Sequence, residues 1–573
     1  MRAALCIFDK TFSMRLIAIL KTSLACGIMI ILLSCSSKTK VDLIIHHAKI
    51  YTVDAAFSLA EAMAVKDGKV VALGKNETIM AAYEAKEIID AAGKAVFPGF
   101  IDAHTHFVNY GLSLQTLNLT GTNSWEDVLH QCSDFAKSLP EGEWLIGRGW
   151  DQNDWPKKEF PDNTTLNEMF PNRPVLLTRI DGHAIVANQK ALDLAGLKPG
   201  TIVAGGEIII KNGKLSGVLV DNATDLVYQK VPGAGPQQTL KALLNAQANC
   251  FAVGLTSVNE CGLDYPMVKF IDSLQKKGEL KMRVYAMLSD NKANYEAAFT
   301  YGKIKTERLQ LNAFKVYADG ALGSRGACLL KPYQDQPNWS GFLLSTAAHF
   351  DSVAQLLSQK GWQMCTHAIG DSGNRAILQV YAKYLKGKND LRWRIEHAQV
   401  IDANDLHFFG DYNIIPSVQP THATSDMYWA GERLGKERVK TAYAYKQLMD
   451  QNQWIPLGTD FPVEDISPFK TFFAAVARQD AKEYPAGGFQ MNNALSRESA
   501  IRGMTIWAAR ASFEEKEKGS LEPGKMADFI LLDTNLMDCP IRNVLNAKVL
   551  ACFVNGEKLY TADTFGPQGS KKP

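Results

Sequence analysis

The stretch Ala95-Val-Phe-Pro-Gly-Phe-Ile-Asp-Ala-His-Thr-His106 is the most informative part of this chain. Its apolar run, which ends in His-x-His, is typical of a buried strand whose last residues leave the core. Residues two apart on a strand point to the same side, so His104 and His106 should converge on one point. Two neutral imidazoles so close together suit a divalent metal such as zinc. Taken alone, the motif fits two unrelated histidines at a strand end equally well.

Short apolar runs that alternate with helical patterns continue along the middle of the chain. This alternation indicates βα units and predicts an α/β fold built on a TIM-type (β/α)8 barrel within residues 96–510. The spacing between the first two runs is too long for one helix, so we expect an insertion at about residues 110–245. The active site of such a barrel lies at the carboxyl ends of its strands. The predicted strands are residues 96–102, 255–260, 282–288, 313–318, 363–366, 393–396, 414–418 and 455–458.

Both ends of the chain carry short alternating runs of a different texture. Asp67-Gly68 is placed as a hairpin turn within residues 41–95, and Asn555-Gly556 is placed in the same way within residues 515–565. Each set of strands alone would leave an apolar face exposed to water. We therefore predict one small β-sandwich formed from both chain ends, with the barrel between its two parts.

The composition of the chain defines its broad class. Of its 573 residues, 46% are hydrophobic and 21% are charged, as in an ordinary globular protein. The 62 basic and 60 acidic residues give a net charge of +2, and no basic stripe is visible. These features argue against a nucleic-acid-binding protein and agree with a soluble protein of enzyme size.

Residues 1–35 have the pattern of a secretory signal peptide. A basic region after Met14 is followed by an apolar segment, and Leu32-Leu-Ser-Cys35 resembles the lipobox of bacterial lipoproteins. We expect export, lipidation of Cys35 and anchoring to a bacterial membrane on its periplasmic or cell-surface side. An uncleaved anchor is the alternative, but Lys21 leaves the apolar run short for a membrane span. The seven cysteines after Cys35 show no paired spacing and predict no disulfide framework.

Four further residues that suit a metal site stand at the ends of predicted strands. Lys315 lies inside an apolar strand, His367 and His397 follow two others, and Asp460 follows the last. Each has a structural interpretation by itself: a core histidine, a lysine whose stem lies along apolar surface, or an aspartate that caps a helix. A barrel brings all these strand ends together, so their order together with His104 and His106 favours one shared metal site.

Several motifs together resemble the amidohydrolase superfamily and, within it, the amidohydrolase-3 group that includes N-substituted formamide deformylase-like enzymes. The resemblance begins with Pro98-Gly-Phe-Ile-Asp-Ala-His-Thr-His106 and covers essentially everything after residue 40. The later motifs are Phe314-Lys-Val-Tyr-Ala-Asp-Gly-Ala-Leu-Gly-Ser-Arg325, His367-Ala-Ile-Gly-Asp371, Glu396-His-Ala398, Gly458-Thr-Asp-Phe-Pro462 and Gly519-Ser-Leu-Glu-Pro-Gly-Lys-Met-Ala-Asp-Phe-Ile530. The leader lies outside this family pattern.

The resemblance implies a two-metal centre at the mouth of the barrel. His104 and His106 would hold one ion, and His367 and His397 would hold the other. An ammonium group cannot bind a cation, so Lys315 would bridge the ions after carboxylation by carbon dioxide to a carbamate. If Lys315 stays unmodified, a centre with one ion is the alternative. Zinc is the expected metal, although the same donors would accept manganese, cobalt or iron.

The resemblance also implies the reaction. A metal-activated hydroxide would attack the substrate carbonyl with Asp460, itself a metal ligand, as general base, and Asp460 would return the proton to the leaving amine. Arg179-Ile-Asp-Gly-His-Ala184 resembles a stretch that lines the family's substrate pocket, which makes His183 a candidate to stabilise the oxyanion. A structural turn at Asp181-Gly182 is the alternative. Gly147-Arg-Gly-Trp-Asp151 suits a loop over the site.

The sequence therefore predicts an exported, lipid-anchored, metal-dependent hydrolase of carbon–nitrogen bonds other than peptide bonds. Its substrate would be a small amide-like molecule, its contact with the membrane would be the lipid on Cys35, and no nucleic-acid partner is expected. Deamination, opening of cyclic amides and ester hydrolysis on the same scaffold are the alternatives, as is a surface lipoprotein without catalysis. The oligomeric state is open, with a homodimer as one expectation.

Overall fold

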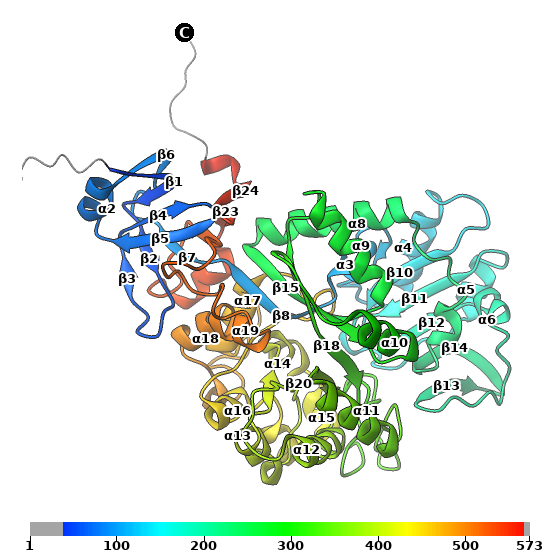
Figure 1. Cartoon of the computed structure of the whole chain (residues 1–573). Coiled ribbons are helices and arrows are strands. Elements are labelled where there is room, and N and C mark those ends of the chain that lie inside the picture. Colours follow the sequence, from blue (N-terminus) through cyan, green and yellow to red (C-terminus); the bar gives the residue numbers. More distant parts are fainter. Residues whose placement is uncertain (1–37, 566–573) are drawn as a thin grey trace, which may run out of the picture.

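A computed structural model describes residues 38–565 of the chain. It contains a near-closed barrel of parallel strands, two small sheets built from the chain ends, and a further sheet inserted into the barrel (Figure 1). The predicted α/β class is confirmed. The predicted signal peptide, with its lipidated Cys35, lies outside the described residues.

The barrel contains seven parallel strands, in the spatial order β8-β15-β16-β18-β19-β20-β21. Buried apolar side chains fill both faces of these strands, as expected for a parallel sheet that is covered by helices. The strands are β8 (Phe100–Thr105), β15 (Leu255–Leu263), β16 (Arg283–Ser289), β18 (Leu309–Tyr317), β19 (Gln363–Ala368), β20 (Arg394–His397) and β21 (Ile415–Ser417), with the short β17 (Ile304–Lys305) paired to β18.

The eighth predicted strand, residues 455–458, is not a regular strand. Pro456 has no N–H to donate to a ladder, which limits the pairing of this segment to an isolated bridge between Leu457 and Val418. The segment is nevertheless bound on both sides: Leu457 O accepts from Ala103 N at 3.1 Å, and Gly458 N donates to Val418 O at 3.0 Å. It therefore occupies the gap between β21 and β8 and is called the closing segment below (residues 456–461).

The first predicted strand, residues 96–102, is in fact two strands that belong to different sheets. β7 (Ala95–Pro98) pairs in a small sheet, and β8 begins at Phe100 in the barrel. Gly99 stands between them, where a Cβ would lie 2.3 Å from the side chain of Thr256. Only glycine fits this close approach, so the chain passes from one sheet to the other at this residue.

Two small sheets lie at one end of the molecule and contain strands from both chain ends (Figure 1). In one of them, β22 (Phe529–Leu532) pairs with β7, so this sheet joins residues more than 400 positions apart in sequence. One apolar cluster includes Leu43 and Ile45 of the first sheet and Phe529 and Phe553 of the second, and the β-sandwich itself stays a prediction. The first sheet is β5 (Lys69–Gly74), β4 (Ala62–Lys66), β1 (Thr39–His46) and β6 (Tyr83–Asp90); the second is β24 (Glu557–Thr561), β23 (Val549–Val554), β22 (Phe529–Leu532), β7, β2 (Lys49–Tyr51) and β3 (Leu59–Ala60).

Between β8 and β15 the chain forms a separate six-stranded sheet with apolar clusters of its own. It falls within the stretch where the insertion was predicted. Figure 1 shows this sheet, in cyan, beside the barrel and on the side away from the small sheets. Its strands, in spatial order, are β13 (Gly206–Lys211), β14 (Lys214–Asp221), β12 (Ala184–Ala187), β11 (Val175–Arg179), β10 (Leu145–Trp150) and β9 (Leu117–Asn118).

Helices cover the barrel and the inserted sheet, and none of those within residues 38–565 is both long and apolar enough to cross a membrane. The seven cysteines in this range are free. The helices are α2 (Asn76–Ala82), α3 (Phe107–Ser113), α4 (Trp125–Ala136), α5 (Thr164–Met169), α6 (Gln189–Leu194), α7 (Asp225–Tyr228), α8 (Pro236–Ala252), α9 (Tyr265–Lys276), α10 (Lys292–Tyr301), α11 (Ala347–Lys360), α12 (Asp371–Leu385), α13 (His407–Asp411), α14 (Pro420–Asp426), α15 (Ala430–Arg438), α16 (Tyr445–Asn452), α17 (Pro468–Ala477), α18 (Arg497–Gly503) and α19 (Ile506–Ala511).

Candidate metal centre and active site

The residues predicted to form the metal site lie together at the carboxyl ends of the barrel strands. Five of the six line a cavity of about 1130 Å³, and the sixth, His104, is fully buried. The cavity lies between the barrel mouth and the carboxyl ends of β10 and β11 in the inserted sheet. The residues are His104 on β8, His106 directly after it, Lys315 on β18, His367 on β19, His397 on β20, and Asp460 in the closing segment.

His104 is held in one orientation by a buried carboxylate. Its Nδ1 lies 2.6 Å from Oε2 of Glu396, which in turn pairs with Arg394, Nε to Oε1, at 2.6 Å. Burial would raise the pKa of Glu396, but Arg394 and His104 outweigh it and keep that pKa far below its usual value. With Nδ1 engaged in this contact, Nε2 of His104 faces Asp460, whose Oδ1 is 3.5 Å away. A carboxylate in this position is the usual partner of a metal-binding histidine.

Asp460 lies among three histidines. Its Oδ1 is 3.3 Å from Nε2 of His106, and its Oδ2 is 3.7 Å from Nε2 of His422 on α14. Within the described residues, Oδ1 of Asp460 and Nε2 of His422 are buried and have no hydrogen-bond partner. Two buried donor atoms without partners, directed at the same space, fit a divalent cation.

His367 and His397 form the other half of the cluster. Their ring centroids are 4.5 Å apart, and the ring of His397 is 4.7 Å from that of His104. Nδ1 of His397 lies 2.8 Å from Oε1 of Gln419, which leaves Nε2 for another ligand. His397 also has a positive φ of 71°, a costly conformation for a residue with a side chain and one that is concentrated at functional sites.

Burial lowers the pKa of each of the four predicted histidine ligands, to about 4 for His104 and well below the usual value for His367 and His397. They are therefore neutral imidazoles near pH 7, the form that binds a metal. Burial would raise the pKa of Asp460, but His104 and His106 outweigh it and lower that pKa well below its usual value. The cluster thus offers neutral nitrogens and one carboxylate, a donor set that suits zinc and other first-row divalent metals.

Lys315 is fully buried, and its Nζ lies 3.3 Å from Nε2 of His104 and 4.7 Å from the centroid of the Tyr317 ring. Burial would lower the pKa of Lys315, but Tyr317 and then Cys261, Glu396 and Asp460 raise it to about 12. Within the described residues no carboxylate lies within 4.0 Å of this nitrogen. As an ammonium group it cannot bind a metal, so a ligand role requires chemical modification.

Two buried acids missed in the sequence analysis tie the site to the barrel. Asp102 accepts from the backbone N–H groups of His104 at 3.1 Å and Thr459 at 3.0 Å, so it joins β8 to the closing segment. Glu260 on β15 accepts from the first backbone N–H groups of α3, including Phe107. Burial raises the pKa of Asp102 to about 7 and that of Glu260 to about 8. The sequence signal that could have identified both residues is an acidic side chain inside an apolar strand.

His183 approaches the cluster from the inserted sheet. Its ring centroid is 5.0 Å from that of His367, and its Nδ1 lies 2.6 Å from Oδ1 of Asp221 on β14. Burial would lower the pKa of His183, but the hydrogen bond to Asp221 outweighs it and raises that pKa. A turn at Gly182, which has a φ of 78°, precedes His183, and His183 lines the cavity.

The stretch Gly147–Asp151 is not the loop that we predicted. Residues up to Trp150 form β10, which pairs with β9 and β11, and Trp150 is buried in the core of the inserted sheet. The two glycines suggested a loop, but in the structure they stand in a strand with close neighbours. A Cβ at Gly149 would lie 2.5 Å from Oγ1 of Thr120, so a larger residue would clash there. The side chain of Arg148 lines the cavity.

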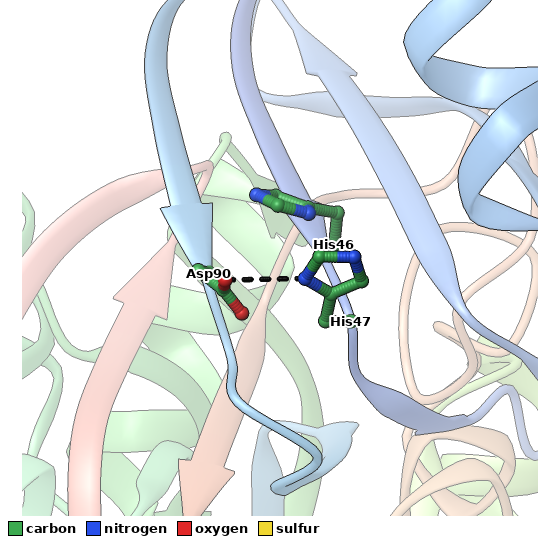
Figure 2. A group of neighbouring side chains, drawn as sticks. All are labelled: His46, His47 and Asp90. Atoms are coloured by element: carbon green, nitrogen blue, oxygen red, sulfur yellow. Dashed lines mark hydrogen bonds and ion pairs between the residues drawn. The ribbon is translucent and has the colours of Figure 1, made fainter.

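A second group of metal-binding residue types lies far from the cavity. His46 and His47 follow one another at the end of β1, and Figure 2 shows both rings beside Asp90 at the end of β6. The ring centroids are 4.3 Å apart, and Nδ1 of His47 lies 3.1 Å from Oδ2 of Asp90. The side chains of His47 and Asp90 are each 55% exposed, so this group provides a control for metal binding by surface histidines.

Comparison with known families gives a match over most of the chain. A model described as the amidohydrolase family matches residues 87–560. This range contains the barrel, the inserted sheet and the strands with which the chain returns to the small sheets.

Curated relatives and a solved structure cover most of the chain at moderate identity. Protein LONG AFTER FAR-RED 3 of Arabidopsis thaliana is 32% identical over 91% of this chain and 91% of its own length. Putative amidohydrolase YtcJ of Bacillus subtilis is 31% identical over 90% and 98%, and N-substituted formamide deformylase of Arthrobacter pascens is 26% identical over 91% and 98%. An uncharacterized metal-dependent hydrolase from Pyrococcus horikoshii has a TM-score of 0.72 and 27% identity, over 87% of this chain and 99% of that one.

Proposed function

The chain belongs to the amidohydrolase family, and from this membership and its donor set we propose that it is a metal-dependent hydrolase of carbon–nitrogen bonds other than peptide bonds, with amides as substrates. One observation carries the proposal: Asp460 Oδ1 and His422 Nε2 are buried, have no hydrogen-bond partner in the described part of the chain, and face the same cluster of neutral histidines. Such a cluster is costly to bury unless it binds a cation.

The proposed ligands form two pairs. His104 and His106 would hold one ion with Asp460, and His367 and His397 would hold a second. The short distances from Asp460 to the first pair and the 4.5 Å between the rings of the second pair support this division. Zinc is our expected metal, and manganese, cobalt and iron are compatible with the same donors.

Lys315 is the proposed bridge between the two ions. Carboxylation of its Nζ by carbon dioxide would replace a cation by a carbamate anion with two oxygen donors. The position of Nζ, 3.3 Å from Nε2 of His104 and without a carboxylate partner among the described residues, supports this role. The reaction needs the neutral amine, and divalent cations nearby would favour it by repelling the ammonium form.

A bound divalent cation would lower the pKa of a water molecule and polarise the substrate carbonyl. In this proposal Asp460 takes the proton from the attacking water and returns it to the leaving amine. His183, fixed by Asp221, would donate a hydrogen bond to the oxygen of the attacked carbonyl. Glu396 acts through His104, whose Nε2 it directs towards the centre.

The substrate class is a small amide. The relative from Arthrobacter pascens is named an N-substituted formamide deformylase, and its alignment with 91% of this chain supports cleavage of an open-chain amide. Deamination, opening of a cyclic amide and ester hydrolysis use a similar attack of water on an unsaturated carbon. They release ammonia, an amine that stays tethered to the product, and an alcohol, respectively. They are the alternatives that the substrate test below must separate.

The test combines a metal count with a substrate panel. Protein lacking residues 1–35, purified without chelators, should contain close to two equivalents of metal per chain by elemental analysis. The variant His47→Ala, which removes an exposed histidine, should contain the same amount. The metal-loaded protein should release amine from open-chain amides faster than it opens lactams, cleaves aryl esters or releases ammonia. About one equivalent would contradict the bridged centre, and metal-loaded protein without activity would contradict the hydrolase.

We also propose that the mature protein is exported and attached to a bacterial membrane through a lipid on Cys35. The lipobox Leu32-Leu-Ser-Cys35 supports this proposal. The wild-type protein should incorporate a labelled fatty acid and sediment with membranes, whereas Cys35→Ala should do neither. Cys539→Ala changes a cysteine far from the lipobox and should leave labelling intact. Equal labelling of the wild type and Cys35→Ala would contradict the lipid anchor.

A further inference from the structure

The cations that line the cavity differ in whether they have a partner. Arg179 lies between the carboxylates of Asp151 and Asp181 and pairs with both. Lys470 pairs with Asp465 at 2.7 Å. These charges are compensated within the protein and are not free for a ligand. The cationic side chains that line the cavity are Arg148, Arg179, Lys315 and Lys470.

Arg148 is the exception outside the metal centre. Within residues 38–565 no carboxylate lies within 4.0 Å of its guanidinium group. Its Nη2 donates to the backbone oxygen of Ile180 at 2.7 Å, while its Nε is buried and has no hydrogen-bond partner there. A guanidinium group carries five N–H donors, so most of its donor capacity is unused.

The strand holds Arg148 at the rim of the reacting centre. The pairing of β10 with β11 shifts register between Arg148 and Trp150, with Gly149 at a φ of 116° between them. Such a bulge redirects side chains at strand ends. The guanidinium lies against Gly182, where a Cβ would be 3.4 Å from Nη1, and His183 follows directly. Arg148 is therefore next to the loop whose histidine contacts the metal cluster.

We propose that Arg148 binds a carboxylate of the substrate, so that the preferred substrates are amides that carry a carboxylate, of which N-acyl amino acids are the simplest. This inference rests on the proposed function. The planar guanidinium matches a carboxylate with two parallel hydrogen bonds. A partly buried cation without a carboxylate partner among the described residues is costly, and a substrate anion would supply that partner. Hydrolysis of such an amide consumes one water molecule and yields a carboxylic acid and an amine that keeps the recognised carboxylate.

Acidic side chains elsewhere in the cavity do not exclude an anion at this position. Asp154, Asp225, Asp426 and Glu464 line the cavity, and none has a cationic partner among the described residues. Burial raises the pKa of each, to about 7 for Asp426, and so favours the neutral acid. Asp181, which is close enough to influence Arg148, is already paired with Arg179.

The test uses two amides that differ by the carboxylate alone, N-acetylphenylalanine and N-acetylphenethylamine. For the wild type, kcat/KM should be roughly 10- to 100-fold higher for the carboxylate, as expected for a pair of charge-assisted hydrogen bonds. Arg148→Met should lose this preference, because its activity on the carboxylate falls far more than its activity on the neutral amide, and it should retain wild-type metal content. Arg148→Lys should keep part of the preference. Arg375→Met, an arginine outside the cavity that pairs with Asp405, is the matched control and should retain all of it.

Two results would overturn the inference: no preference in the wild type, or an equal loss on both amides in Arg148→Met. Binding of the two compounds to Asp460→Asn and to Asp460→Asn/Arg148→Met, measured by calorimetry, gives a readout that does not depend on turnover. Tighter binding of the carboxylate that disappears with Arg148 supports the inference even if neither amide is hydrolysed. In that case only the proposed reaction fails.

Discussion

Asp460→Asn should reduce turnover of the metal-loaded protein by about 10²- to 10⁴-fold, the range found for loss of general acid–base catalysis. The amide of asparagine keeps the shape of the side chain and one oxygen donor but cannot accept and return a proton near pH 7. Much of the metal should therefore stay bound. Elemental analysis and kcat, measured on the same preparation, check both parts of this expectation.

The expected loss of turnover is specific to the carboxylate of Asp460, so the same substitution of an aspartate elsewhere should not cause it. Asp411, whose side chain is 63% exposed, lies on α13 away from the cavity. Asp411→Asn should retain wild-type kcat and metal content. Unchanged turnover in Asp460→Asn would remove Asp460 from the proton transfer, and complete loss of metal would show that its main role is as a ligand.

His104→Ala should lose both metal and activity. The substitution removes the Nε2 that lies 3.5 Å from Asp460 and leaves Glu396 without its histidine partner. Metal content per chain should fall by about one equivalent or more, and hydrolysis should fall with it, since the remaining donors cannot complete the first ion's shell. Elemental analysis together with amide hydrolysis measures both effects.

A second variant separates metal binding from folding. His104 is fully buried, so its loss also costs stability, whereas the side chain of His106 is 20% exposed at the cavity. His106→Ala should lose metal from the same ion with a smaller fall in melting temperature. His47→Ala should lose none from the barrel. Full metal content in folded His104→Ala would exclude this residue as a ligand.

The barrel and the donors at its strand ends could be predicted because their signals are local in sequence. His104 and His106 end an apolar run two positions apart, and His367 and His397 each follow another such run. Strand periodicity places such residues at one end of a parallel sheet whatever the chain does between the strands. The one predicted strand that failed to form contains Pro456, although β21 forms with Pro416 inside it, so the proline alone did not predict this outcome.

The residues that orient the donors could not be predicted, because their partners are distant in sequence. Glu396 contacts His104 across 292 residues, and Asp102 binds Thr459 across 357. The pair of Glu396 with Arg394 is local in sequence, but nothing in the sequence shows that Glu396 also contacts His104 or that Asp102 binds the closing segment. Arg148 was missed because its local sequence is misleading: the glycines on both sides of it indicate a loop. The close neighbours that require a glycine at position 149 are known only from the inserted sheet.

By itself, the sequence determined the α/β class, the order of the barrel strands and the set of metal-binding residue types that end them. These properties depend on periodicity and on side-chain chemistry, which each segment carries alone. Tertiary contacts set how Glu396 directs His104 and how the closing segment completes the barrel. They also place Arg148 at the cavity without a carboxylate partner among residues 38–565. These depend on which segments meet, because charge compensation and close packing are properties of pairs of residues.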